Sequence, residues 1–156
     1  MYLNQSYFGD TRRVASEQFR RLQAQAQRGK LWSTVTGKRR ELKNLYDVEK
    51  AMQIRVRTHA GLQLVPISRI QGSEGRCDDF DADFRPLRNH TKDRWVGIAM
   101  AHSNEEALPA VELVQIGDTF FVRDGHHRIS VAKLFGQLEI EAEVTVWQGP
   151  AASRSV

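Results

Sequence analysis

A short run of residues near position 125 combines the types that bind phosphate groups. An apolar stretch leads into Asp124-Gly125, and a helix is expected to begin directly afterwards. Gly125 permits a tight bend and close approach of the backbone to a ligand. The first helical turn offers unpaired N–H groups and a dipole that favours anions, to which Arg128 adds a guanidinium. The dipole contributes roughly 0.3–1 kcal/mol and a charge-assisted bond about 1.5–3 kcal/mol, so Arg128 should dominate and should face solvent.

A purely structural interpretation of the same run stays open. Asp124 can be the residue that caps the helix, Gly125 a turn former, and His127 the satisfied partner of a buried backbone group. Two adjacent histidines and an arginine exceed what capping needs, but residue types alone do not decide between the two interpretations.

The run also resembles the nucleotide-binding motif of the ParB/sulfiredoxin superfamily. ParB proteins carry G-E-R-R here and sulfiredoxins G-C-H-R, and the present chain has Gly125-His126-His127-Arg128. Upstream, Val65-Pro66-Ile67-Ser68-Arg69-Ile70 is similar to the V-P-L-x-x-I segment that opens ParB domains. Residues 76–81, Arg-Cys-Asp-Asp-Phe-Asp, resemble the following R-x-x-F-D segment stretched by one residue. The resemblance covers about residues 64–147.

The resemblance implies a compact α+β domain that binds a nucleoside triphosphate, ATP or CTP, usually with Mg²⁺. The nucleotide-binding residues that it implies are Arg76, Asp124, Gly125, His126, His127 and Arg128. The chain also departs from the family. His126 occupies the position of the sulfiredoxin cysteine, and Cys77 lies in another segment, so the sulfiredoxin repair reaction is not expected. ParB partition proteins continue into a helix-turn-helix domain, whereas this chain ends soon after Trp147, so sequence-specific centromere binding is not expected either.

An acidic segment supplies candidate metal ligands and bases. Mg²⁺ typically takes one or two carboxylates together with substrate phosphates. We assign Asp78 and Asp81 as metal ligands and give Asp79, Asp81 and His127 catalytic roles. The alternative is a solvated loop in which Asp79 or Asp81 caps a turn. Glu74 is a further candidate base, and three other histidines lack metal-ligand spacing and are interpreted as structural or surface residues: His59, His90 and His102.

The elements that must position these residues follow from hydrophobic patterning. The front of the chain is expected to be helical after Asp10, with a weak point at Gly29-Lys30 and a second helix after Thr36-Gly37. Gly72 to Asp83 is expected to be a loop. Alternation and turn residues predict strands at 53–57, 62–67, 110–116, 119–123 and 140–147, with turns at Ala60-Gly61 and Gly117-Asp118, and helices at 92–101 and 126–135. Such a mixture predicts an α+β fold, a small mixed sheet with packed helices behind a helical N-terminal arm.

Charged residues are distributed unevenly along the chain. Residues 1–60 hold an excess of eight positive charges and residues 61–156 an excess of four negative ones, which gives the net charge of +4. We therefore divide the chain into a basic helical extension at 1–52, a ParB/sulfiredoxin-like domain at 53–150 and a frayed tail at 151–156. Arg13, Arg20 and Arg21 do not fall on one clean helical face. If the basic stretch from Arg12 to Lys43 binds nucleic acid, deletion of residues 1–36 should abolish that binding and leave the nucleotide-induced thermal shift intact.

Three functions are compatible with these features. The first is a nucleotide-binding domain with NTPase or phosphotransferase activity. The second is a nucleic-acid-binding protein or ParB-like nuclease, whose basic helices bind the phosphate backbone of the nucleic acid without sequence preference. The third is a nucleotide-gated interaction module without turnover. The basic arm can instead dock on the acidic half or on another copy, as in a homodimer. No apolar run is long enough to span a membrane, no secretory signal is visible, and the single cysteine favours a reducing cytoplasm.

Overall fold

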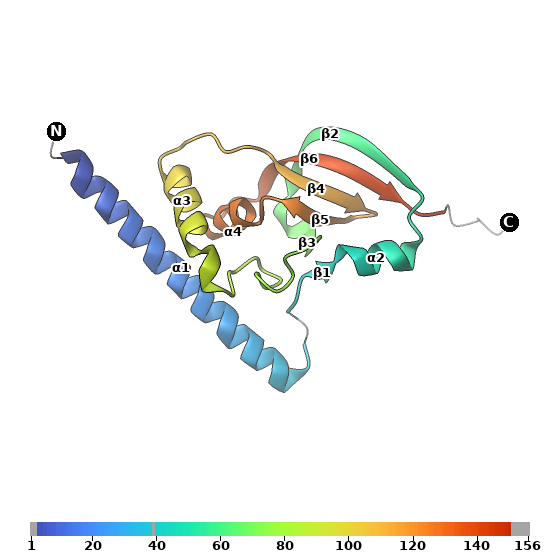
Figure 1. Ribbon diagram of the computed structural model, residues 1–156, viewed down its shortest axis with the longest axis horizontal. Helices are drawn as coiled ribbons and strands as arrows, with labels where there is room; N and C mark the ends of the chain where they lie inside the picture. Colours follow the sequence, from blue (N-terminus) through green and yellow to red (C-terminus); the bar gives the residue numbers. More distant parts are fainter. Residues whose placement is uncertain (1–2, 39, 151–156) are drawn as a thin grey trace.

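The computed structural model describes residues 3–38 and 40–150 (Figure 1). The predicted tail at 151–156 lies outside the described residues. Along the chain the elements are α1 (Leu3–Thr36), β1 (Lys43–Asn44), α2 (Leu45–Met52), β2 (Val56–Pro66), the 3-10 turn η1 (Ile67–Arg69), β3 (Ile70–Ser73), the 3-10 turn η2 (Asn89–Thr91), α3 (Lys92–Ser103), β4 (Val111–Ile116), β5 (Thr119–Asp124), α4 (His126–Leu134) and β6 (Glu139–Gln148).

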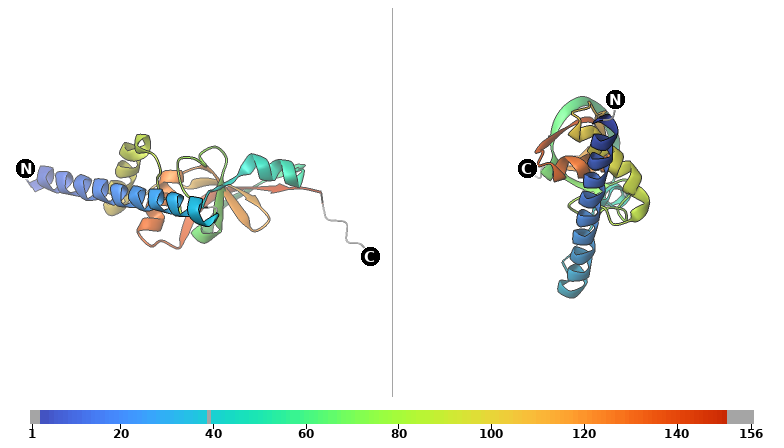
Figure 2. Two further views of the ribbon diagram at one scale, coloured as in Figure 1. Left: turned by 90° about the horizontal axis from the view of Figure 1, so that it is seen from below. Right: turned by 90° about the vertical axis from the view of Figure 1, so that its left-hand side faces the viewer.

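The six strands form one mixed sheet in the order β1-β3-β5-β4-β6-β2. The neighbours β1–β3, β3–β5 and β4–β6 are parallel, whereas β4–β5 and β2–β6 are antiparallel. Helices α3 and α4 lie together at one side of the strands, and α2 lies beside β1 at the other (Figures 1 and 2). A mixed sheet with helices packed on it confirms the predicted α+β class.

Three apolar clusters hold these layers together. The largest joins one face of the sheet to α4 through Val111, Val122 and Ile129, and it includes Phe80 and Phe84 from the segment between β3 and η2. A second cluster lies on the other sheet face and includes Val114, Phe121 and Trp147 together with Leu45 of α2. The third packs Ala15 and Phe19 of α1 against Trp95, Val96 and Ala99 of α3 and Val131 of α4. Residues 1–52 thus contribute to the same core as residues 53–150.

The front of the chain differs from its predicted pattern. Helix α1 continues without a break through Gly29, which is buried close to the Arg40 side chain, and it ends at Gly37 with φ +71°. The predicted second helix does not start there. Residues 40–42 instead lead into β1, and α2 begins at Leu45, where Asn44 caps it by accepting the Tyr46 N–H at 2.9 Å.

Two expectations about the strands were also wrong. The two strands predicted on either side of Ala60-Gly61 form one strand, β2, because the chain takes a bulge at Gly61 (φ +81°) and then keeps its pairing with β6. The loop predicted from Gly72 begins with strand β3, which pairs with β5. Gly72 allows this pairing, since a Cβ there would overlap the Phe121 ring.

Helix α1 begins at Leu3 and not after Asp10, so Asp10 lies inside the helix and does not cap it. Several other predicted elements are confirmed. The hairpin at Gly117-Asp118 joins β4 to β5, α3 covers 92–103, and β6 is the last strand. Helix α4 begins at His126 and is followed by Gly136 at φ +74°. Among the described helices, none is long and apolar enough to cross a membrane.

Candidate phosphate-binding site

The junction of β5 and α4 has the geometry that the sequence predicted. Strand β5 ends at Asp124, Gly125 adopts φ +106° as the N-cap, and the Ile129 N–H closes the first turn on the Gly125 carbonyl at 3.0 Å. A Cβ at Gly125 would overlap Val111, so both the backbone angle and the packing require glycine. The backbone amides of residues 126–128 come before that first intrahelical bond and form the anion-attracting end of the helix.

Arg128 does not face solvent, contrary to the prediction. Its side chain is 12% exposed, and its guanidinium donates to the carbonyls of Pro109 at 2.7 Å and Ala110 at 2.9 Å and to Asp124 Oδ2 at 2.8 Å. Asp124 therefore pairs with Arg128 and makes no side-chain cap bond to α4. This arginine ties α4 to the segment before β4, which gives it a structural role.

His126 is buried beside a serine of β3. Its Nε2 lies 2.7 Å from Ser73 Oγ, and that oxygen accepts the N–H groups of Gly75 at 3.3 Å and Arg76 at 3.0 Å. Because the serine oxygen already accepts two bonds, its hydroxyl hydrogen is the one that points to Nε2, and the imidazole is neutral. Burial lowers the pKa of His126 to about 3, and the charge of Arg76 adds to this effect. Ser73 is fully buried, so this pair holds the β3 loop against α4 and offers no nucleophile to a substrate.

His127 is the one residue of the motif with an unsatisfied buried atom. It is 5% exposed, packs edge-on against the Phe80 ring with centroids 5.3 Å apart, and its Nε2 has no hydrogen-bond partner among the described residues. Burial lowers the pKa of His127 to about 4, and the charges of Arg76 and Arg94 lower it further. Two guanidiniums therefore lie close enough to act on this imidazole.

Arg76 also belongs to a group of side chains that surround one aspartate. Asp79, whose side chain is 17% exposed, lies 3.6 Å from Arg76 Nη1, 3.8 Å from Arg88 Nε and 3.7 Å from His90 Nε2. All three distances exceed that of a hydrogen bond. Arg94 is exposed at the start of α3 and makes no ion pair with any described residue. We call Arg76, Asp79, Arg88, His90, Arg94 and His127 the arginine cluster; its positive charge exceeds what Asp79 can neutralise.

The other acidic residues of this segment have mostly internal partners. Asp81 is buried: its Oδ1 accepts the N–H groups of Asp83 and Arg85 at 3.0 and 2.8 Å, and its Oδ2 accepts Arg85 Nε at 2.9 Å. Glu74 accepts Arg123 Nε at 3.0 Å. In the described chain no group of three or more His, Cys, Asp or Glu could hold a metal ion. Asp81 therefore holds a turn, and of the two assigned metal ligands only the exposed Asp78 is free of such bonds.

Cys77 is a half-buried thiol. Its Sγ lies 3.7 Å from the carbonyl oxygens of Lys43 and Ser73. Burial and the neighbouring Asp78 raise its pKa, so the thiol stays protonated at neutral pH.

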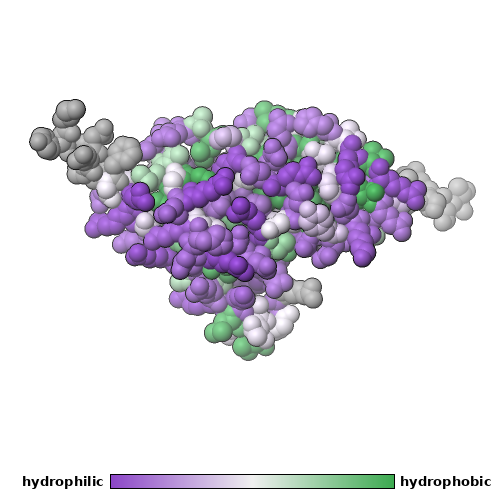
Figure 3. All heavy atoms as spheres, viewed as in Figure 1, coloured by the Kyte–Doolittle hydropathy of each residue, from purple (hydrophilic) through white to green (hydrophobic). Residues whose placement is uncertain are grey.

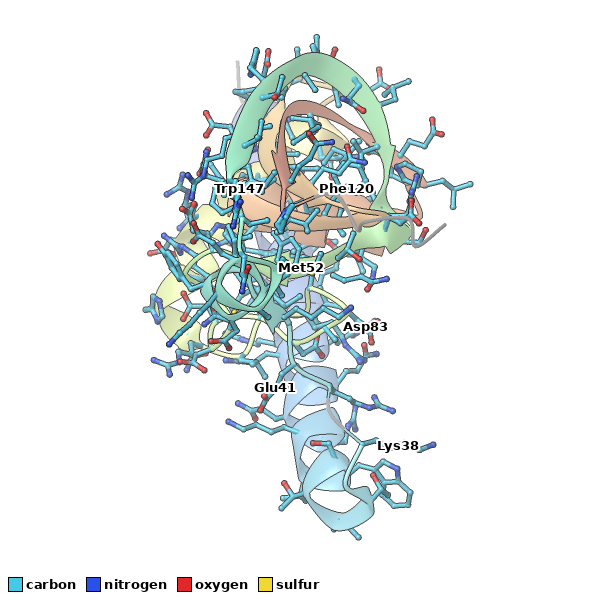
Figure 4. The ribbon with its side chains drawn as sticks, turned by 90° about the vertical axis from the view of Figure 1, so that its right-hand side faces the viewer. Lys38, Glu41, Met52, Asp83, Phe120 and Trp147 are labelled. Carbon is cyan, nitrogen blue, oxygen red and sulfur yellow. The ribbon has the colours of Figure 1, made fainter. Side chains whose placement is uncertain are left out.

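A groove of about 210 Å³ adjoins the arginine cluster and shares Arg88 with it. It runs between the second half of α1 and the segment before η2, and Phe80 lies between it and the two histidines. Its walls include Ala26, Lys30, Ser33, Arg40, Cys77 and Leu87. Figure 4 labels Glu41, which also lines the groove, near the end of α1.

The structure brings some of the predicted residues together and adds others. Arg76, Asp79, His126 and His127 meet at the start of α4, whereas Asp81, Asp124 and Arg128 are engaged elsewhere. Sequence reasoning missed Arg88 and Arg94 and interpreted His90 as a structural or surface residue. These residues flank η2, and only the fold brings them to Asp79. The only local signal for Arg88 and Arg94 is that they lie close together in the sequence with a third basic residue, Lys92.

No family model and no curated protein matches the sequence. Among solved structures, the chain is similar to the crystal structure of sulfiredoxin from Arabidopsis thaliana. The two share 11% sequence identity at a TM-score of 0.40, and the similarity covers 53% of this chain and 82% of that one. This chain's own mixed sheet and helices establish its α+β class.

Proposed function

We propose that this protein binds a nucleoside triphosphate at the start of α4, with its phosphates held by the arginine cluster. The observation that carries the proposal is the loose pairing of Asp79 with two guanidiniums and an imidazole at 3.6–3.8 Å, beside a buried imidazole nitrogen that has no hydrogen-bond partner among the described residues. A phosphate group would accept hydrogen bonds from the two guanidiniums at closer range and from the first-turn amides of α4.

In this proposal Arg76 replaces Arg128 as the main phosphate ligand. Its backbone N–H is fixed by Ser73, while its side chain is 42% exposed and makes only the loose contact with Asp79. Arg76 acts electrostatically on both His126 and His127, so its guanidinium is close to the helix start. Arg88 lies 3.8 Å from the other carboxylate oxygen of Asp79, and the charge of Arg94 acts on His127. Together the three arginines match a ligand with several negative charges.

The groove beside Arg88 is the proposed place for the nucleoside. It adjoins the arginine cluster, and its wall combines apolar atoms of Ala26 and Leu87 with polar side chains of Lys30 and Ser33. A sugar and base could lie there while the phosphates reach Arg88. Ser33→Trp would fill this groove; it should weaken binding of the nucleotide but not of inorganic triphosphate.

Turnover is the second part of the proposal. Phosphoryl transfer depends mostly on positioning and charge stabilisation, which the arginines would supply. Asp79 is the carboxylate best placed to orient an attacking water or hydroxyl, and His127 stays neutral at pH 7 as a hydrogen-bonding group. Among the described residues the acidic side chains do not form a ready Mg²⁺ site, so any such ion would be held largely by the nucleotide's own phosphates.

A thermal-shift panel tests the binding proposal. ATP, CTP and GTP, their diphosphates and inorganic triphosphate would each be added with and without Mg²⁺. At 100-fold excess over Kd, one-site linkage gives about 2.7 kcal/mol. For a domain of this size the corresponding rise in Tm is roughly 5–10 °C. No shift with any triphosphate would contradict the proposal. Phosphate release measured on the ligand that binds then separates an NTPase from a nucleotide-gated module without turnover.

A further inference from the structure

The end of α1 carries an apolar surface that none of the other residues described by the structure covers. Leu31, Trp32 and Val35 are 74%, 61% and 78% exposed, and the last buried residue of the helix is Gly29. Figure 1 shows this end of α1 extending beyond the sheet and the other helices, and Figure 3 shows apolar residues gathered on it. We call Leu31, Trp32 and Val35 the apolar tip.

The apolar tip continues a basic helical face. At 3.6 residues per turn, Arg13, Arg20, Arg21 and Arg28 fall within about 100° of the helix circumference, on the side away from Phe19 and Ala26, and the tip residues follow on the same side. All four arginines are exposed. Because α1 is one continuous helix, Arg13, Arg20 and Arg21 share this face, contrary to the expectation from the sequence. Arg20, Arg21 and Arg28 form no ion pair with a described residue. A partner for this surface must offer both negative charge and apolar area.

The outer face of the β2–β6 ribbon has the complementary composition. In the β2–β6 register Leu62 pairs with Glu143 and Leu64 with Glu141, and Glu112 of β4 lies beside Glu143, so these side chains share one face. Leu62 and Leu64 are 55% and 65% exposed, and the three glutamates are exposed as well. We call these five residues the acidic sheet face. Glu112 and Glu141 form no ion pair with a described residue.

The two surfaces cannot meet within one molecule. The apolar tip lies at the lower end of the view in Figure 1, and β2 and β6 arch over the opposite end; the right-hand view of Figure 2 shows the same separation. We propose that the apolar tip of one copy docks on the acidic sheet face of a second copy, with Arg28 and Arg21 opposite its glutamates. Because the two surfaces differ, this contact is head-to-tail and can extend to further copies.

A second copy fits these surfaces better than a nucleic acid does. Phosphates could pair with the arginines and a base could stack on Trp32, but Leu31 and Val35 would gain no cover. The exposed leucines of the acidic sheet face would also stay in water. A copy of the chain covers both apolar surfaces and neutralises both sets of charges in one contact.

Sedimentation velocity on full-length variants tests this proposal. The weight-average mass of the wild type should rise with concentration above the 17.8 kDa monomer. Trp32→Glu places a negative charge in the apolar tip, and Leu64→Lys places a positive charge in the acidic sheet face. Each variant alone should remain monomeric. Tyr46→Glu, at a residue 57% exposed on α2, is the matched control and should associate as the wild type does. All three sites are exposed, so circular dichroism should show unchanged folding.

Mixing the two variants gives the decisive result. The Leu64→Lys chain keeps its tip and the Trp32→Glu chain keeps its sheet face, so an equimolar mixture should form dimers of one copy each and no larger species. A wild type that stays monomeric, a mixture that stays monomeric, or association that survives both substitutions would overturn the proposal. So would a wild type whose tip binds a DNA duplex but no second copy.

Discussion

Arg128 illustrates how a residue's surroundings change its assignment. The motif suggested a solvent-facing phosphate ligand, but three acceptors on Pro109, Ala110 and Asp124 hold its guanidinium in place. We predict that Arg128→Ala lowers the free energy of unfolding by about 1.5–3 kcal/mol, because two backbone carbonyls lose a charged donor. Urea unfolding measures this. An unchanged midpoint would show that the bonds contribute nothing and would restore Arg128 as a candidate ligand.

The low pKa values of His126 and His127 predict that acid lowers the stability of the folded protein. Their pKa values of about 3 and about 4 in the folded chain lie below the ordinary 6.5, so below pH 6.5 the unfolded chain binds protons that the folded chain does not. Stability should be complete above that pH and should fall as the pH drops towards 4, with about 2 kcal/mol lost per histidine at pH 5. Thermal unfolding at pH 7 and pH 5 compares the wild type with a His126→Asn, His127→Asn double variant. Equal losses in both proteins would contradict this assignment.

At the scale of elements, the β5–α4 junction depends on one glycine. Gly125→Ala would put a Cβ into Val111 at φ +106°, which combines strain with overpacking. We predict a loss of stability of about 2–4 kcal/mol. Gly75→Ala is the matched control, since no heavy atom lies within 4 Å of its added Cβ and its backbone angle suits other residues. Equal stabilities of the two variants would show that the junction tolerates a side chain.

The sequence predicted elements well where local chemistry decides them. The hairpin at Gly117-Asp118 and the α4 start after Gly125 follow from turn residues and hydrophobic period, and both are confirmed. Prediction from the sequence failed where contacts between distant parts of the chain determine the structure. The bulge at Gly61 stays within one strand because β6 pairs on both sides of it, and β3 forms because β5 lies beside Gly72. The arginine cluster was missed for the same reason, as Arg88 reaches Asp79 only through the fold.

For the whole molecule, α1 is part of the core and not a removable arm. Phe19 is fully buried and meets Trp95 edge-on with ring centroids 5.7 Å apart. We predict that Phe19→Ala costs about 3–5 kcal/mol, whereas Val14→Ala, at a residue 48% exposed, costs little. Deletion of residues 1–36 should therefore unfold or strongly destabilise the remainder, which reverses the earlier expectation. A truncated chain with the Tm of the full chain would contradict this view of α1.

Calorimetric titration of a nucleoside triphosphate into three proteins tests the central claim most directly. These are the wild type, Arg76→Ala and Arg69→Ala. The two arginines are matched, because their side chains are 42% and 44% exposed and each forms one ion pair, but Arg69 pairs with Asp118 at the β4–β5 hairpin. Arg76→Ala should weaken binding by about 1.5–3 kcal/mol, roughly 10- to 150-fold, and Arg69→Ala should leave it unchanged. Equal affinities for all three proteins, or no binding by the wild type, would contradict a phosphate site at the arginine cluster.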